Sequence, residues 1–337
     1  MPSQKELTDP TSSTRSVRTV PLVDVNLITY NHEKFVSQAI ESVLEQKTSF
    51  AYRLIIGDDC STDSTQSIIT SYAQQYPERI QLMIASEHRG MDNKDRVGLE
   101  VLRLSTAKYI ALLDGDDYWT DPNKLQRQVD FLESFTGCSL CFHNAEMFYD
   151  DGSQPPKRLR PQDQKEISTV EDILAGTVPL PCTVLFRNDL LVLPDEFYKV
   201  TNADWMMWAL LADRGHVGYI NEVMAAYRMH PQGIWSRLTP TQRLKEHIDT
   251  YKTINEHLKF RHNGLIVDRI AALKEQHARW CLDQYYELVK NGEIRMALRS
   301  LMEATHSAPL EVLHPRRLAA VLKNGLVGAL RKNSAQS

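Results

Sequence analysis

Short apolar runs alternate with stretches of helical spacing through the first third of the chain. The runs are rich in β-branched residues, which is typical of buried strands, whereas apolar residues three and four positions apart predict helices. Strands are expected at residues 23–28, 52–56, 80–84 and 109–113, and helices at 35–44, 64–76 and 94–104. The alternation predicts an α/β fold, with a mostly parallel sheet that is flanked by helices on both faces.

The pattern becomes less regular after Asp117. Further strands are expected at residues 139–143, 183–187, 217–220 and 224–229, and a helix is expected to start near Asp204. The polar, proline-containing segment 152–166 predicts a long loop. From Thr239 onward, apolar residues return at helical spacing and predict a C-terminal extension of roughly four helices.

The composition excludes several classes of protein. The 337 residues carry a formal net charge of -4, so no overall basic field favours a nucleic-acid partner. The chain has no apolar run of eighteen residues, and its polar first eighteen residues predict a disordered leader over residues 1–20 rather than a signal peptide. Five unpatterned cysteines favour a reducing compartment, and Cys138 and Cys141 are interpreted as core residues of a strand.

Polar clusters follow three of the expected strands. They are Thr29 to Asn31, Asp58 with Asp59, and Asp114 to Asp117. Ligands of open α/β sheets bind outside the carboxyl ends of the strands. We therefore expect the three clusters to line one crevice.

Asp114-Gly115-Asp116 predicts a cation site within this crevice. Two carboxylates that are two residues apart at a strand end can share one Mg²⁺ or Mn²⁺ ion, because these cations prefer oxygen ligands. Gly115 allows a close turn there. Such a cation commonly keeps substrate phosphates in its coordination shell, which favours a diphosphate ligand.

The other candidate residues each have a structural alternative. Asp58 and Asp59 are suited to turn and cap chemistry or to accepting hydrogen bonds from a nucleobase. Tyr30 is suited to packing between strand and helix or to stacking on a base. Asp204 is suited to a helix cap or to a general base. Arg228 and His230 alternate onto one face of a strand, where both are suited to contact a diphosphate or a cation.

Five stretches together resemble the family-2 glycosyltransferases with the GT-A fold. They occur in the family's order over about residues 22 to 236, and they read VNLITYNHEKFVSQAIESVLEQ, RLIIGDDCSTDST, KYIALLDGDDYW, NADWMMWALL and YINEVMAAYRMH. The resemblance implies a catalytic domain at residues 21–237, with a nucleotide-sugar half at about 21–120 and an acceptor half at about 121–237. Residues 238–337 form the helical C-terminal region of this scheme.

The resemblance also implies roles for individual residues. Thr29, Tyr30, Asp58, Asp59 and Asp114 would bind the nucleotide, with Tyr30 at the base, Asp59 on the imide of uracil or thymine, and Asp114 at the ribose. Asp116 and His230 would hold Mn²⁺ or Mg²⁺ on the diphosphate, supported by Asp117 and Arg228. Asp204 would be the general base of an inverting displacement.

The implied activity is metal-dependent transfer of a sugar from a UDP- or dTDP-linked donor to a hydroxyl of a glycan, a lipid-linked acceptor or a protein, in cell-surface polysaccharide or glycan assembly. The chain departs from the family pattern at Ile28, which replaces a proline, and at Cys60, which replaces a glycine.

Two other functions remain open at this stage. A non-catalytic nucleotide-sugar-binding or scaffold protein would keep the crevice, although the intact Asp114, Asp116 and Asp204 disfavour it. A haloacid-dehalogenase-like phosphatase also uses Asp-x-Asp after a strand, but Tyr118 occupies the position where that class has Thr or Val.

The segment 315–332 is basic at both ends and apolar between them. This pattern is suited to a peripheral contact with an anionic membrane, to packing on the catalytic domain, or to a contact in an oligomer. The expected location is therefore the cytoplasm or the inner face of the membrane.

Overall fold

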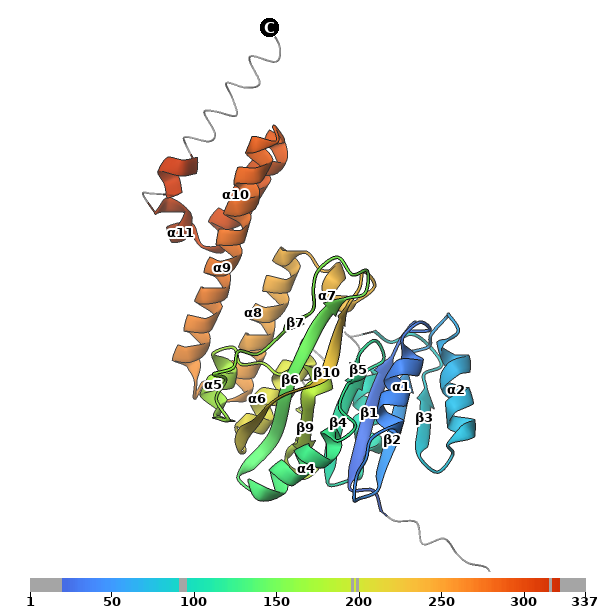
Figure 1. The fold of residues 1–337 in the computed structure, drawn as a ribbon. Coiled ribbons are helices and arrows are strands. Elements are labelled where there is room, and N and C mark those ends of the chain that lie inside the picture. The colour runs from blue at the N-terminus through green and yellow to red at the C-terminus, as the bar shows by residue number, and fades with distance from the viewer. Residues whose placement is uncertain (1–19, 91–95, 195–196, 198–199, 315–316, 322–337) are drawn as a thin grey trace, which may run out of the picture.

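The computed structural model describes residues 20–90, 96–194, 197, 200–314 and 317–321. A mixed sheet forms its centre, with the strand order β3-β2-β1-β4-β9-β6-β10-β5 (Figure 1). Helices flank this sheet, and a separate set of helices follows it at the C-terminal end. The α/β fold with a helical extension, predicted from the sequence, is confirmed.

The first half of the sheet is parallel. It contains β1 (Val23–Thr29), β2 (Tyr52–Asp58), β3 (Ile80–Ile84) and β4 (Tyr109–Asp114). β1 pairs in parallel with both β2 and β4, and β2 pairs in parallel with β3. These strands agree closely with the predicted ones, because each is a short, mostly apolar segment, and β1, β2 and β4 end at polar clusters.

Helices cover both faces of this parallel half. The core on one face includes side chains from α1 (Val36–Leu44), α2 (Thr65–Gln75) and α4 (Lys124–Ser134). The opposite face packs against α3 (Val97–Leu104), whose Val97 and Val101 join a second cluster. Helix α4 was not predicted from the sequence, because two of its buried positions are the polar Lys124 and Gln128.

The second half of the sheet mixes strand directions. β9 (Val184–Arg187) runs antiparallel to both β4 and β6 (Cys138–Tyr149), whereas β10 (His216–Met229) runs parallel to β6. The two strands predicted at 217–220 and 224–229 are one strand, β10, whose register shifts between Ile220 and Val223 and again before Ala225. The two-residue strand β5 (Tyr118–Trp119) pairs with Ala225 and Ala226 of β10 and was not predicted.

Short elements connect these strands. The segment 152–166, predicted as a loop, contains the two-residue strand β7 (Lys157–Arg158). The rest of this segment is the irregular connection that was expected. The remaining connections hold β8 (Ile167–Ser168), α5 (Val170–Leu174), η1 (Pro181–Thr183), η2 (Asn188–Leu190) and α7 (Ile234–Arg237).

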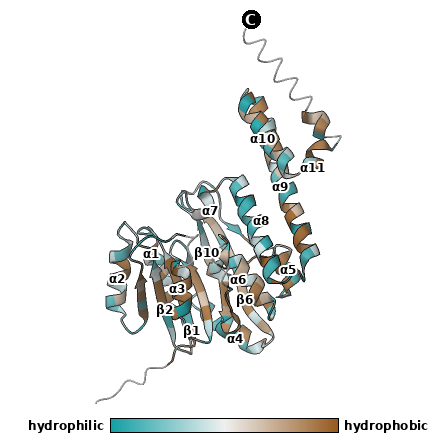
Figure 2. Ribbon diagram, turned by 180° about the vertical axis from the view of Figure 1, so that it is seen from behind, coloured by the Kyte–Doolittle hydropathy of each residue, from teal (hydrophilic) through white to brown (hydrophobic). Residues whose placement is uncertain are grey.

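The C-terminal helices are α8 (Pro240–His257), α9 (Asn263–Lys290), α10 (Ile294–Ser307) and α11 (Pro309–Leu313). Tyr251 and Ile254 of α8 and Leu273 of α9 belong to the same hydrophobic cluster as the second half of the sheet. Figure 2 shows hydrophobic colour on the strands of the sheet and mainly hydrophilic colour along α8. The distal part of α9 packs with α10 and α11 in a cluster of its own. The domain boundary at 237/238 stays a prediction. The core that the sheet shares with α8 and the first part of α9 crosses this boundary.

Two predictions fall largely outside the described residues. One is the disordered leader at 1–20, of which the structure describes only residue 20. The other is the segment 315–332, with its alternatives of a membrane, domain or oligomer contact, of which the structure describes only 317–321. Among the described helices, none combines the length and apolar character that crossing a membrane requires.

Cys60 adopts a left-handed backbone conformation with φ of 60°. This conformation costs an L-residue with a side chain about 1–2 kcal/mol, whereas glycine adopts it freely. We expect Cys60→Gly to raise the free energy of unfolding by about 1 kcal/mol, measured by urea denaturation. Cys60→Ala removes the thiol but retains the strain, so it is the matched control. Equal stability of both variants and wild type would show that this backbone position carries no strain.

Candidate active site

The three polar clusters lie together at one edge of the sheet. Thr29 pairs with Asp58 across β1 and β2, and Ile28 pairs with Asp114 across β1 and β4. The backbone continues this contact beyond the strands, since the N–H of Asp59 donates to Thr29 O (3.0 Å) and that of Gly115 donates to Ile28 O (2.8 Å). The convergence expected from the strand ends is confirmed.

Gly115 allows the tightest approach in this region. A Cβ atom at this position would lie 2.7 Å from Thr29 Oγ1 and 2.9 Å from His32 Nδ1. Both neighbours are held by the β1–α1 connection, where the His32 N–H donates to Thr65 Oγ1. A residue with a side chain would therefore push apart the two loops that carry Asp116 and His32.

Asp116 faces two imidazole rings. Its Oδ2 lies 3.0 Å from His230 Nε2 and 3.7 Å from His32 Nε2. Burial raises the pKa of Asp116, but the hydrogen bond with His230 and the charges of His32 and His230 outweigh it, so the pKa lies below its usual value. Burial lowers the pKa of His32. The side chains thus present a carboxylate and two imidazole rings at one point.

Arg228 connects the Asp116 loop to the rest of the site. Its Nε donates to Asp116 O (2.9 Å), its Nη1 to Asp150 (2.6 Å) and its Nη2 to Gln38 (2.7 Å). The guanidinium also lies over the ring of Phe35, at 4.5 Å from its centroid. The structure therefore uses Arg228 to position the loop, and its contact with a diphosphate stays a prediction.

Asp117 lies beneath this loop, 2 % exposed, and accepts the Arg228 N–H at 2.9 Å. Burial and the charges of Asp116 and Asp114 raise its pKa well above the usual value. These contacts hold Asp117 beneath the loop, and its supporting role stays a prediction.

Asp114 and Asp204 influence each other electrostatically. Burial raises the pKa of Asp114 to about 8, and the charges of Asp116 and Asp204 add to this effect. Burial also raises the pKa of Asp204 to about 6, against the opposing effect of backbone N–H groups and of Arg96. The ribose-binding candidate and the base candidate therefore belong to one acidic crevice.

Asp204 lies in the first turn of α6 (Ala203–Ala212). Its carboxylate interacts with the N–H groups of Asp204 and Trp205, but the N-cap of this helix is Asn202, not Asp204 as the cap alternative had it. Beside it, the ring of Trp205 stacks on His247 of α8 (centroids 4.5 Å apart), and Trp235 of α7 lies 5.4 Å from the same ring. An aromatic surface from three helices thus adjoins Asp204.

The predicted base-binding residues lie at the far side of the crevice. The ring of Tyr30 stacks on His88, with centroids 4.1 Å apart. Asp59 accepts the N–H groups of Arg89 and Gly90, both at 2.9 Å, and pairs with His88. Asp58 is fully buried and bonds Ser61 and Gln66, which is the turn chemistry that the sequence offered as its alternative.

Sequence reasoning missed His32 and His88. His32 directly follows the Thr-Tyr-Asn cluster, so its place in the motif was a usable signal. His88 is brought to Tyr30 by a loop after β3 that has no motif, and no signal in the sequence marks it.

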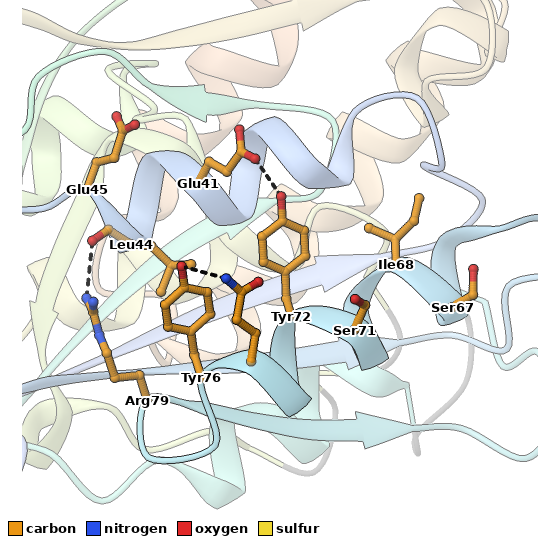
Figure 3. Close-up of a pocket in the computed structure, with 10 residues that line it drawn as sticks. Glu41, Leu44, Glu45, Ser67, Ile68, Ser71, Tyr72, Tyr76 and Arg79 are labelled. Carbon is orange, nitrogen blue, oxygen red and sulfur yellow. Dashed lines mark hydrogen bonds between the residues drawn. The ribbon is translucent and has the colours of Figure 1, made fainter.

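Two hollows lie near α1, beside the parallel half of the sheet. A small one of about 200 Å³ is lined by Asn31, Phe35, Asp63 and Gln232 among others, and it borders the ring contact between Phe35 and His230. A wider groove of about 780 Å³ runs between α1 and α2, where Figure 3 shows Glu41 bonded to Tyr72 and Arg79 bonded to Leu44. None of the candidate site residues lines this wider groove.

The donor atoms at Asp116 fit a divalent cation. One carboxylate oxygen of Asp116 lies 3.0 Å from His230 Nε2 and 3.7 Å from His32 Nε2. Carboxylate ligands suit Mg²⁺ and Mn²⁺, and imidazole is compatible with the latter.

Curated relatives share the sheet region. An uncharacterized protein of Mycobacterium tuberculosis, Rv1520, is 33% identical over 208 residues, which cover 62% of this chain and 59% of that protein. The chain thus matches about three fifths of the length of its mycobacterial relatives. The putative teichuronic acid biosynthesis glycosyltransferase TuaG of Bacillus subtilis is 27% identical over 266 residues, covering 79% of this chain and 94% of TuaG.

Solved structures share the fold over nearly the whole chain. S. aureus TarS 1-349 in complex with UDP-GlcNAc aligns with a TM-score of 0.58 and 16% identity, covering 93% of this chain and 92% of that one. The mannosyltransferase PcManGT of Pyrobaculum calidifontis, in complex with GDP-Man and Mn²⁺, aligns with a TM-score of 0.55 and 17% identity, covering 93% and 87%.

The family model that matches is Glycosyl transferase family 2, over residues 24–191. This range contains the three converging clusters and ends shortly before Asp204. The chain belongs to glycosyltransferase family 2 and has the GT-A fold.

Proposed function

We propose that this protein is an inverting glycosyltransferase that moves a sugar from a nucleoside-diphosphate donor to a hydroxyl acceptor. One observation carries the proposal: Asp116, just after β4, faces His230, just after β10, and Asp114 at the end of β4 experiences the charges of both Asp116 and Asp204 of α6. A donor-binding group and a base candidate thus occupy one crevice of a family-2 chain.

The Tyr30–His88 pair is the proposed site of the nucleobase. Each carboxylate oxygen accepts two hydrogen bonds, so Asp59, with its bonds to Arg89 and Gly90 and its pairing with His88, retains capacity for one further donor. The imide N–H of uracil or thymine is such a donor. A UDP- or dTDP-linked sugar is therefore the proposed donor, with Thr29 and Asp114 toward the ribose and Asp58 supporting the turn.

Asp116 and His230 are the proposed ligands of Mn²⁺ or Mg²⁺. A bound cation would neutralise charge on the diphosphate leaving group. The structural neighbour PcManGT was solved with Mn²⁺, which supports a cation in this fold. Arg228 and Asp117 keep Asp116 directed at His230 through their contacts with the loop.

Asp204 is the proposed general base. It removes the proton of the acceptor hydroxyl as that oxygen attacks the anomeric carbon, and the nucleoside diphosphate departs from the opposite side. A single displacement of this kind inverts the anomeric configuration. A base with a pKa of about 6 is deprotonated at neutral pH and still accepts a proton readily.

The aromatic surface beside Asp204 is the proposed acceptor platform. Trp205 and Trp235 both contact the ring of His247, and sugar rings pack well on such aromatic groups. A glycan acceptor in cell-surface polysaccharide assembly fits this surface, and the printed name of TuaG supports that class of pathway.

A location in the cytoplasm or on the inner face of the membrane completes the proposal. All five cysteines are unpaired, which suits a reducing compartment. The match to a glycosyltransferase family leaves the phosphatase alternative without support. The non-catalytic alternative is tested by the experiments below.

Asp116→Ala is expected to weaken binding of UDP or dTDP in the presence of Mn²⁺ at least tenfold, about 1.4 kcal/mol, because it removes the cation's carboxylate ligand. Calorimetric titration of UDP, dTDP, GDP and CMP with and without Mn²⁺ measures this. Asp189→Ala, at an exposed aspartate remote from the crevice, is the control. A folded wild-type protein that binds no nucleotide would overturn the donor site.

Asp204→Asn is expected to slow hydrolysis of the preferred nucleotide sugar, with water as acceptor, roughly 10²–10⁴-fold. The amide keeps the shape of the side chain at the helix start but accepts no proton. Affinity for the nucleoside diphosphate should stay as in wild type. Equal hydrolysis by wild type and variant would exclude Asp204 as the base, and no hydrolysis by a wild-type protein that binds nucleotide would favour the non-catalytic alternative.

The hydrolysis rate is also expected to fall as the pH drops through about 6. Burial raises the pKa of Asp204 to about 6, and only the deprotonated carboxylate, present above that pH, acts as a base. A pH–rate profile of kcat/KM between pH 5 and pH 8 measures this fall, roughly tenfold per pH unit below the pKa. The residual activity of Asp204→Asn should lack this limb, and an identical limb in the variant would assign it to another group.

A further inference from the structure

The C-terminal helices contain a second cluster of ligand-type side chains, away from the sheet. His277 and Cys281 lie one turn apart on α9, and Glu303 lies on α10. One ligand atom from each of the three lies within 4.8 Å of the others. Residues four apart on a helix project from the same face, so the α9 pair is directed at one point.

The spacing of these atoms fits a tetrahedral metal site. Cys281 Sγ lies 3.7 Å from His277 Nε2. Bonds from zinc to sulfur of about 2.3 Å and to nitrogen of about 2.0–2.1 Å place two such ligands roughly 3.5 Å apart. A zinc ion would therefore need only small movements of these two side chains.

His277 also has the outer contact that metal-binding imidazoles usually have. Its Nδ1 lies 2.8 Å from Ser307 Oγ, a residue near the end of α10. Ligating histidines generally donate their second ring N–H to an oxygen, which fixes the orientation of the ring. Cys281 Sγ lies 3.7 Å from Nε2 and 3.8 Å from Nδ1, and the Ser307 contact on Nδ1 leaves Nε2 as the nitrogen for a metal.

The fourth position is lined by α8. Thr241 Oγ1 lies 3.1 Å from His277 Nε2 and donates to Glu303 at 2.9 Å. Glu303 keeps 32% of its side chain exposed, whereas Cys281 is fully buried. The cluster thus has a polar side open to solvent, which an ion needs for entry, and an enclosed thiol side.

We propose that His277 Nε2, Cys281 Sγ and the Glu303 carboxylate bind a zinc ion, with Thr241 or water in the fourth position. Thiolate and imidazole ligands favour Zn²⁺ over Mg²⁺ and Mn²⁺. This ion would join α9 to α10 beside the start of α8 and is separate from the cation proposed at Asp116. Cys281 also belongs to the hydrophobic cluster between α9 and α10, so its thiol is held at a fixed place beside His277.

The test measures zinc in purified full-length protein that carries no polyhistidine tag. After incubation with zinc chloride and gel filtration, elemental analysis is expected to find about one zinc per chain in wild type. Cys281→Ser, which nearly preserves size, should lose this zinc. Cys60→Ser is the matched cysteine control and should keep it, as should Asp116→Ala, which affects only the other proposed cation site.

Thermal unfolding gives a second measurement on the same proteins. Zinc chloride should raise the melting temperature of wild type and of Cys60→Ser but not that of Cys281→Ser or His277→Ala. Zinc retained equally by wild type and Cys281→Ser, or absent from wild type with no effect on melting, would overturn the proposal and leave the cluster as a hydrogen-bond network.

Discussion

The arrangement of the candidate site depends on one side chain, the guanidinium of Arg228. It bonds the Asp116 backbone and the side chains of Gln38 and Asp150, and it lies over Phe35. These contacts tie the end of β10 to α1 and to the loop between β4 and β5. Because His230 is two residues further along, its approach to Asp116 is a consequence of where Arg228 is held.

The residues of the crevice combine structural and chemical roles, which explains why their sequence signals are ambiguous. Asp58 is used entirely by its turn, whereas Asp59 holds the following loop and retains capacity for a ligand. Asp204 accepts N–H groups of α6 and yet keeps a pKa of about 6, since burial outweighs those bonds. Assigning such residues either to structure or to function is too simple, because the contacts that fix a carboxylate also tune its protonation.

The parallel half of the sheet and its polar edge were predictable, because β1, β2 and β4 are short, mostly apolar segments that end at aspartates or at Thr29. Helix α4 escaped because its buried face includes Lys124, and β10 was divided in two because polar residues at its register shift, Asn221 and Glu222, interrupt the pattern. The contacts of His88 with Tyr30 and of His277 with Glu303 join segments far apart in sequence. Periodicity describes local structure only, so it carries no information about such pairs.

The hydrophobic cluster shared by α6, α8 and the first half of α9 has a consequence for building chimeras. An exchange of acceptor regions between relatives that cut the chain before α8 would split a single core and expose Tyr251 and Ile254. The junction that keeps each core whole lies within α9, between Leu273 of the first cluster and Ala278 of the second. Because α9 is one continuous helix, the C-terminal helices of a relative could be joined to it in helical register at this point.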